Sequence, residues 1–256
     1  MTARGAPSLS SLLRGLGKGQ KKPMAIVLAG HNGSGKSTLW RDKLGPTLQM
    51  PLLNADHLTS SILPLQSPLP PWAQKLRNDD DRWARLSQEG VRAFKTLVMR
   101  EGLPFAFETV FSHFVRHPDG QVDSKADDII EMQREGYFVV LVFVGLAHVN
   151  LSITRVGQRV EQGGHNVPLH KLLQRFDRTR AAIGHAASIA DATLMFDNSL
   201  GGQLGFSLAR VQQRHDVLFD VRTDGARVHP HIRRLAGGWL DVVCPATPAP
   251  AARGVA

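Results

Sequence analysis

One stretch of the chain reads Met24-Ala25-Ile26-Val27-Leu28-Ala29-Gly30-His31-Asn32-Gly33-Ser34-Gly35-Lys36-Ser37-Thr38. Its first six residues are all apolar, which is typical of a buried central strand in a parallel sheet. A glycine-rich turn follows, and residues 37–44 favour a short helix that Gly45 and Pro46 end. A strand that leads through a glycine-rich turn into a helix predicts an α/β fold.

The turn itself matches the pattern G-x-x-x-x-G-K-[ST] at Gly30, Gly35, Lys36 and Ser37. Its glycines let the backbone curl so that several N–H groups face phosphate oxygens. The start of the following helix adds a partial positive charge. We expect residues 30–38 to bind ATP or GTP, with Lys36 on the β- and γ-phosphates and the Ser37 hydroxyl on Mg²⁺. The motif alone does not name a reaction.

Outside this unit, short apolar runs alternate with segments of helical periodicity. Strand runs lie at residues 51–54, 103–107, 137–144 and 192–196, and helical segments at residues 79–100, 123–134, 149–160 and 169–190. Together with the first strand, they predict a parallel five-stranded sheet with helices on both faces. Ligands of such sheets bind beyond the carboxyl ends of the strands, so the residues that follow each strand are candidate site residues.

The segments that flank this alternation differ in composition. Residues 1–22 contain no acid and are rich in Ser, Arg and Lys, so we expect a disordered basic arm. Residues 23–200 would form the main domain. Residues 201–242 would form an extension with a small β-hairpin, because residues 206–222 alternate polar and apolar side chains. The Pro- and Ala-rich residues 243–256 are expected to be a disordered tail.

Charge and composition narrow the partners. The formal net charge of +9 suits a phosphate-rich partner, but does not choose between a nucleotide, a nucleotide sugar and a nucleic acid. The only cysteine is Cys244, which excludes an intrachain disulfide and fits a reducing compartment such as the cytoplasm. The longest apolar stretch, Tyr137–Val149, has 13 residues, fewer than the roughly 18 that a membrane span needs. We therefore expect a cytoplasmic protein without a membrane partner.

Four further stretches accompany the loop in a fixed order. They are Asn54-Ala55-Asp56, Phe107-Glu108-Thr109-Val110 with Ser112-His113, Arg155-Val156 with residues 159–168, and Phe196-Asp197-Asn198-Ser199. With these stretches the chain resembles the zeta toxin family, and more closely the zeta-toxin-like P-loop kinases, over residues 24–199. The resemblance implies a nucleotide-kinase-like fold and ATP-dependent phosphorylation of a sugar hydroxyl of UDP-N-acetylglucosamine. Zeta-type toxins are usually blocked by a small helical antitoxin that covers the nucleotide site, but nothing in this sequence shows such a partner.

Two acids follow predicted strands. Asp56 comes after the second strand and matches the position of the family's proposed base, which accepts the proton of the acceptor hydroxyl; the alternative is an N-cap of the next helix. Glu108 follows the third strand, where an unpaired carboxylate would be costly. The resemblance implies that Glu108 contacts the acceptor sugar, and Mg²⁺ binding is the alternative because the fourth strand ends at Gly145 without an acid. The nearby Thr109 and Ser112 hydroxyls are further candidates for substrate contacts.

Several arginines flank the glycine pair Gly163-Gly164, and we expect a lid at about residues 155–180 that closes over the triphosphate. The cluster comprises Arg155, Arg159, Arg175, Arg178 and Arg180. Guanidinium groups suit the charge that spreads over a transferring phosphoryl group. The alternative is a solvated helix face. Arg159 and Arg175 are the first candidates for a catalytic role.

Two other functions compete with a small-molecule kinase. A P-loop ATPase or switch acting through a protein partner would need an acid after the fourth strand, where Gly145 stands. A nucleic-acid kinase would suit the charge, but the sequence shows no interleaved aromatic and basic residues for base stacking, so nucleic acid is ranked lower.

Overall fold

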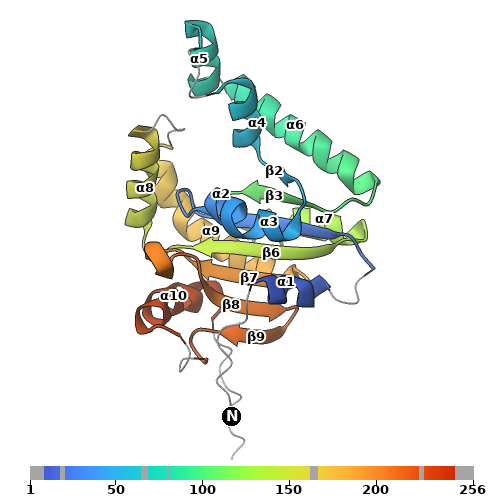
Figure 1. Ribbon diagram of the computed structural model, residues 1–256, viewed down its shortest axis with the longest axis vertical. Coiled ribbons are helices and arrows are strands. Elements are labelled where there is room, and N and C mark those ends of the chain that lie inside the picture. The colour runs from blue at the N-terminus through green and yellow to red at the C-terminus, as the bar shows by residue number, and fades with distance from the viewer. Residues whose placement is uncertain are drawn as a thin grey trace, which may run out of the picture.

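The computed structural model describes residues 9–17, 21–64, 69–79, 81–161, 167–224 and 228–245. A seven-stranded sheet forms its middle layer, in the order β2-β3-β1-β6-β7-β8-β9 (Figure 1). The strands are β1 (Met24–Gly30), β2 (Leu52–Leu53), β3 (Phe105–Thr109), β6 (Phe138–Gly145), β7 (Ala192–Asp197), β8 (Ser207–Gln213) and β9 (Asp216–Asp220). The first five in the spatial order are parallel, as expected from the continuous apolar runs.

The C-terminal hairpin does not stand apart from this sheet. β8 pairs antiparallel with β7, and β9 pairs antiparallel with β8. The apolar side chains of Ala209 and Val211 on β8 are fully buried in the common core. The hairpin thereby covers the edge of β7 that a five-stranded sheet would leave open. The small hairpin was expected, and it extends the five parallel strands to a seven-stranded sheet.

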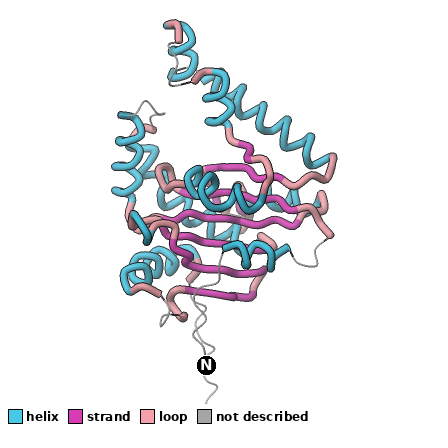
Figure 2. Tube along the Cα trace, in the orientation of Figure 1, coloured by secondary structure: helices cyan, strands magenta, loops and turns pink. Residues whose placement is uncertain are grey.

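Helices lie on both faces of the sheet (Figures 1 and 2). The helical elements are α1 (Leu9–Gly17), α2 (Lys36–Leu39), the π-helical turn η1 (Trp40–Leu44), α3 (Gly45–Leu48), α4 (Ala55–Ile62), α5 (Pro71–Asp79), α6 (Asp81–Arg100), α7 (Ala126–Arg134), α8 (Val149–Glu161), α9 (Leu169–Ile189), the short 3₁₀ turn η2 (Gly202–Leu204) and α10 (Pro230–Val243). In Figure 1, α2 and α3 lie in front of the sheet and α7 and α9 behind it, while α5 and α6 project beyond the β2 edge.

The helices α1, α3, α5 and α10 occupy segments for which no helix was expected. α3 begins at Gly45 and contains Pro46, so the expectation that these two residues end the helix after the loop is wrong. α1 lies in the arm expected to be disordered, and its Leu13 and Leu16 are buried in the core because leucines recur there at helical spacing. α10 lies in the extension expected to form only a hairpin. Residues 1–8 and 18–20 of the arm are outside the described residues. Residues 246–256, which make up most of the expected tail, are outside them too.

A second small sheet pairs β4 (Phe114–Arg116) with β5 (Val122–Ser124). The helix predicted from residue 123 begins only at Ala126, because residues 122–124 form β5. The Ser124 hydroxyl accepts a hydrogen bond from the Ala126 amide at the start of this helix. Within the ranges that the structure describes, no helix is both long and apolar enough to cross a membrane.

Candidate active site

The glycine-rich loop lies at the carboxyl end of β1, between β3 and β6. Its glycines are required by close approaches of other backbone and side-chain atoms. A Cβ on Gly30 would lie 2.6 Å from the Val144 carbonyl oxygen, and one on Gly35 would lie 2.8 Å from Asn198 Nδ2. Gly35 also has a left-handed backbone with a φ of 90°, which L side chains rarely adopt. These close approaches and the backbone of Gly35 explain why glycines stand at positions 30 and 35 of the predicted phosphate-binding loop.

Neighbouring elements hold the loop by hydrogen bonds. Ser152 Oγ on α8 donates to the Asn32 carbonyl oxygen over 2.7 Å, and Asn198 Nδ2 after β7 donates to the Ser34 carbonyl oxygen over 2.8 Å. The sequence marked Ser152 in no way, and Asn198 only as part of the stretch Phe196-Asp197-Asn198-Ser199 that carries the family resemblance. Neither residue was assigned a role, because each contacts a loop more than a hundred positions away in the chain.

The His31 side chain points away from the cavity described below and into the core. Its ring stacks on Phe176 of α9 at a centroid distance of 4.1 Å and lies edge-on to Phe143 of β6. Burial, together with the charges of Arg180 and Lys36, lowers the pKa of His31 to about 3. His31 is therefore neutral at physiological pH, and its contribution to the loop is through its backbone and its packing.

Lys36 begins α2 and is buried. Its Nζ donates to the carbonyl oxygens of Gly30 over 3.2 Å and His31 over 3.1 Å, and it lies 3.7 Å from Glu108 Oε1. Burial lowers the pKa of Lys36, while the carboxylates of Glu108 and Asp56 act in the opposite direction. The ammonium group is thus held in the loop beside Glu108, and Asp56 acts on it electrostatically.

Glu108 lies on β3 at the register position of Leu28 on β1, which places it beside the loop. Its Oε2 accepts hydrogen bonds from Ser37 Oγ over 2.9 Å and from Asn54 Nδ2 over 2.8 Å. A serine hydroxyl beside a carboxylate offers the hard oxygen ligands that Mg²⁺ prefers. The residues present therefore fit a divalent cation at this point.

Asp56 lies in the first turn of α4, but it is not the N-cap of that helix. Asn54 is the cap, because its Oδ1 accepts from the backbone amides of Asp56 over 2.7 Å and His57 over 3.3 Å. The capping interpretation of Asp56 is wrong for this reason. An asparagine that precedes a predicted helix is a recognised capping signal. The cap at Asn54 could therefore have been predicted from the sequence.

One cavity of about 830 Å³ unites the predicted side chains. Its lining includes Lys36, Asp56, Glu108, Thr109, Ser112, Arg159 and Arg175. These residues come from α2, α4, β3 and the segment after it, α8 and α9. The carboxyl ends of parallel strands meet at one edge of a sheet, which explains the convergence.

The far wall of the cavity is formed by α6 and α7. Lys95 of α6 donates to Asp128 Oδ1 over 3.1 Å and to Glu131 Oε2 over 2.7 Å, and its Nζ lies 5.7 Å from the centre of the Phe107 ring. This wall therefore presents fixed charges of both signs above an aromatic ring. Such a lining suits a polar molecule that also has a flat or apolar part.

Only some of the five arginines of the expected lid line the cavity. Arg159 and Arg175 line the cavity. Arg180 does not, since its Nη2 donates to the carbonyl oxygens of Leu146 over 3.1 Å and Ala147 over 3.0 Å, and its guanidinium lies 4.4 Å from the centre of the Phe176 ring. The glycine pair Gly163-Gly164 is outside the described residues.

Comparison with known proteins places the chain in a family. The model of the zeta toxin family matches residues 11–199. A structure from work on the PezAT chromosomal toxin–antitoxin system of Streptococcus pneumoniae is 14% identical, with a TM-score of 0.51 over 91% of this chain and 84% of that one. The complex of AvrRxo1-ORF1 and AvrRxo1-ORF2 with ATP contains a chain that is 13% identical, with a TM-score of 0.58 over 89% of this chain and 67% of that one.

At such low identities these two likenesses show the fold alone, which is similar to that of P-loop kinases. No curated protein sequence matched the chain. The family model covers most of the chain, including the loop and every predicted cavity residue, so the protein belongs to the zeta toxin family.

Proposed function

We propose that this protein transfers the γ-phosphate of ATP to a hydroxyl of a small molecule, with a nucleotide sugar such as UDP-N-acetylglucosamine as the acceptor. Family membership and the kinase-like fold support a P-loop phosphotransferase. The observation that carries the proposal is the single cavity in which Lys36, Asp56, Arg159 and Arg175 come together. Phosphoryl transfer is catalysed mainly by positioning and by charge stabilisation, and these four side chains supply both.

Each residue would have a distinct role. The loop from Gly30 to Thr38 would hold the phosphates through its backbone amides, as in other loops of this type. Lys36, Arg159 and Arg175 would stabilise the charge on the transferring phosphoryl group. Asp56 would accept the proton of the acceptor hydroxyl from its place on the cavity wall.

Mg²⁺ would be held by the Ser37 hydroxyl with the Glu108 carboxylate beside it. The bound cation would neutralise negative charge on the β- and γ-phosphates. Glu108 would at the same time orient Ser37 and Asn54, since all three side chains share one hydrogen-bonded group. Thr109 and Ser112 would contact the acceptor from the segment that follows β3.

A protein partner is proposed on separate grounds. The PezAT structure belongs to a toxin–antitoxin system, and the AvrRxo1 structure is a complex of two gene products. We infer that an antitoxin that covers the nucleotide site would inhibit this chain as well.

A transfer assay tests the proposal. The full-length protein is incubated with Mg²⁺, ATP labelled on the γ-phosphate, and UDP-N-acetylglucosamine, other nucleotide sugars or oligonucleotides, and the products are identified by mass. We expect label on a nucleotide sugar, and none with a Lys36→Ala variant, which should bind no ATP.

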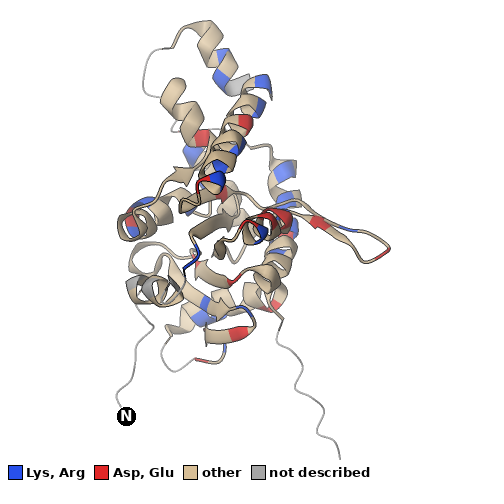
Figure 3. Cartoon of the chain, turned by 90° about the vertical axis from the view of Figure 1, so that its right-hand side faces the viewer, with Lys and Arg blue, Asp and Glu red and all other residues tan. Residues whose placement is uncertain are grey.

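Other outcomes separate the competing functions. Label released only as inorganic phosphate would refute a kinase and support an ATPase or switch. Label on oligonucleotides would support a nucleic-acid kinase. Basic and acidic positions are interspersed over the projecting helices and the body in Figure 3, which does not favour that function.

A further inference from the structure

α10 lies beyond the residues that the family model matches, yet a chain of hydrogen bonds connects it to the nucleotide loop. We propose that Trp239 of α10 is a positioning residue for ATP binding. It fixes the carboxylate of Asp197, which sets the turn from which Asn198 holds the loop. The inference rests on the nucleotide-binding part of the proposed function and not on the identity of the acceptor.

The first contact in the chain is a buried one. Trp239 Nε1 donates to Asp197 Oδ2 over 2.7 Å, and the two side chains belong to residues that are 2% and 0% exposed. A carboxylate buried this deeply is stable only where donors surround it. Ser199 supplies the others, since its amide donates to Asp197 Oδ1 over 3.0 Å and its hydroxyl to Oδ2 over 2.8 Å. Among the hydrogen bonds of the described residues, Trp239 is the donor to Asp197 that comes from outside the turn.

The turn then presents Asn198 to the loop. The Asn198 amide donates to the Gly145 carbonyl oxygen over 3.1 Å, and its side-chain Oδ1 accepts from the Phe206 amide over 3.3 Å. Its Nδ2 donates to the Ser34 carbonyl oxygen, which fixes the peptide plane between Ser34 and Gly35. The amide of that peptide belongs to the loop that cradles phosphates. A fixed amide binds an anion more tightly than one that must first rotate.

The indole ring has no room to shift. A Cβ on Gly145 would lie 2.8 Å from the ring of Trp239, and Phe143 meets the same ring edge-on at a centroid distance of 5.5 Å. Gly145 is the residue that ends β6 without an acid. Its lack of a side chain therefore has a positive reason, because it admits the indole to the end of the sheet.

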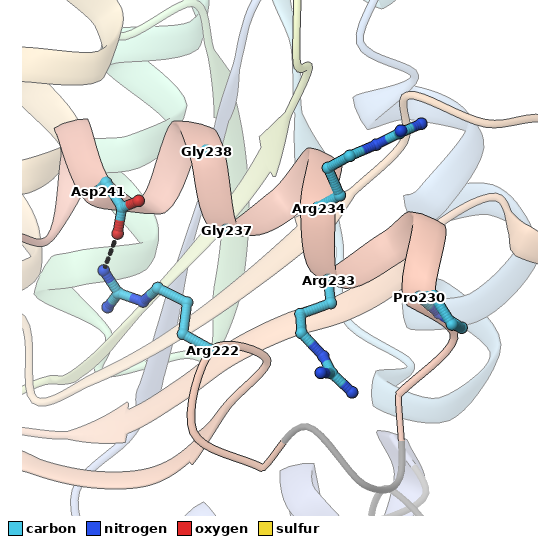
Figure 4. Close-up of a pocket in the computed structure, with 7 residues that line it drawn as sticks. All are labelled: Arg222, Pro230, Arg233, Arg234, Gly237, Gly238 and Asp241. Atoms are coloured by element: carbon cyan, nitrogen blue, oxygen red, sulfur yellow. Dashed lines mark hydrogen bonds and ion pairs between the residues drawn. The ribbon is translucent and has the colours of Figure 1, made fainter.

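The opposite side of α10 is fastened independently (Figure 4). Arg222 Nη1 donates to Asp241 Oδ1 over 2.9 Å and to the Cys244 carbonyl oxygen over 3.0 Å, beside a shallow cavity of about 480 Å³. The same guanidinium also binds Asp220 at the end of β9. The helix is thus held in place by contacts other than the one to Asp197, so that the effect of the Trp239 donor can be tested separately.

The test measures the affinity of the full-length protein for ATP with Mg²⁺ by calorimetric titration, with no acceptor present. Trp239→Phe keeps an aromatic ring but removes the donor. We expect ATP to bind about tenfold more weakly, because the amide between Ser34 and Gly35 must then be ordered when the phosphates bind. Val243→Ala is the matched control. Val243 is buried on the same helix, and its apolar side chain cannot donate a hydrogen bond to Asp197. This variant should lower the Tm by a similar amount and leave ATP affinity unchanged.

A double variant distinguishes positioning from a general loss of stability. Asn198→Ala alone should also weaken ATP binding, and adding Trp239→Phe to it should weaken binding no further, because both changes act through the same contact. Where Trp239→Phe does not fold, Asp197→Asn replaces it, since the amide cannot accept from all three donors, and the same tenfold weakening is expected.

The inference alone is overturned by wild-type affinity in Trp239→Phe, or by fully additive effects in the double variant. Equal weakening in Trp239→Phe and Val243→Ala would also overturn it, since stability would then account for both. A wild-type protein that binds no ATP would refute the proposed function together with this inference.

Discussion

The proposed role of Asp56 as a base can be tested by a single substitution. Asp56 lies on the cavity wall without serving as the helix cap, and its charge acts on buried Lys36. The proposed base therefore lies within electrostatic reach of the lysine proposed to bind the phosphates.

We expect Asp56→Asn to reduce phosphoryl transfer by about a hundredfold or more, since general base catalysis typically contributes that much. ATP affinity should change by only a few fold because the loop is intact. Single-turnover transfer and calorimetric ATP titration on the same preparation measure the two effects. Wild-type turnover in this variant would remove Asp56 from the mechanism.

His31 makes stability depend on pH. Its pKa is about 3 in the folded protein against 6.5 in the unfolded chain. Below pH 6.5 the unfolded chain takes up a proton that folded His31 does not, so the free energy of unfolding falls as the pH drops from 6.5 toward 3. At pH 5 this loss amounts to about 2 kcal/mol.

His31→Phe should remove that part of the pH dependence. The phenyl ring can keep the stack on Phe176, and it lacks the buried Nε2 that has no hydrogen-bond partner among the described residues. Urea unfolding of both proteins at pH 8 and pH 5 gives the comparison. An equal drop in the two proteins would show that other groups cause it.

At the scale of elements, the β8–β9 hairpin is joined to α10 by buried charge. Asp220 at the end of β9 accepts hydrogen bonds from Arg210 of β8 and from Arg222. Burial would by itself raise the pKa of Asp220, but the hydrogen bonds and charge of Arg222, with the hydrogen bond of Arg210, outweigh it and lower the pKa. The carboxylate therefore stabilises the fold above its unfolded pKa of 3.8, and this stabilisation is lost as the pH falls through the lower folded value.

Asp220→Ala should destabilise the protein by about 3 kcal/mol, because it leaves two partly buried arginines without their shared partner. Asp216→Ala is the control on the same strand, and since Asp216 is exposed its effect should stay within about 0.5 kcal/mol. Denaturant midpoints of the two variants and the wild-type protein measure these changes in stability. Similar midpoints would mean that the buried network contributes little.

At the scale of the whole molecule, the C-terminal extension and the kinase-like part share one core. Residues of β8, β9 and α10 lie in the same buried cluster as β1, β3, β6 and β7; they include Ala209, Val211, Phe219, Ile232, Trp239 and Leu240. The expected boundary at residue 200 therefore passes through a continuous hydrophobic interior.

A chain that ends at Leu204 should fail to fold as a soluble monomer. It would expose the edge of β7 and the apolar surface that α10 covers, and an open edge beside an apolar face favours aggregation. Circular dichroism and size-exclusion chromatography of the truncated chain test this expectation. A monomeric, folded product that binds ATP would contradict both this prediction and the role of Trp239.

The elements that the sequence predicted well are those with a strong local pattern. β1, β3, β6 and β7 are apolar runs that end at turn residues, and each was predicted within a few residues of its bounds. α1 and α10 were missed although their leucines and other apolar residues recur at helical spacing. Both helices bury these residues in the common core, and such packing supplies most of the stability of a short helix. The roles of the site residues remain predictions.

The sequence by itself determined the loop from Gly30 to Thr38, the alternation of strands and helices, and the family, because each of these depends on residues close together in the chain. Only the tertiary structure decided that Glu108 binds Ser37 and that Trp239 approaches the nucleotide loop through Asp197. Those contacts join residues far apart in sequence, and they arise only when burial of the common core brings the strand ends and the C-terminal helix together.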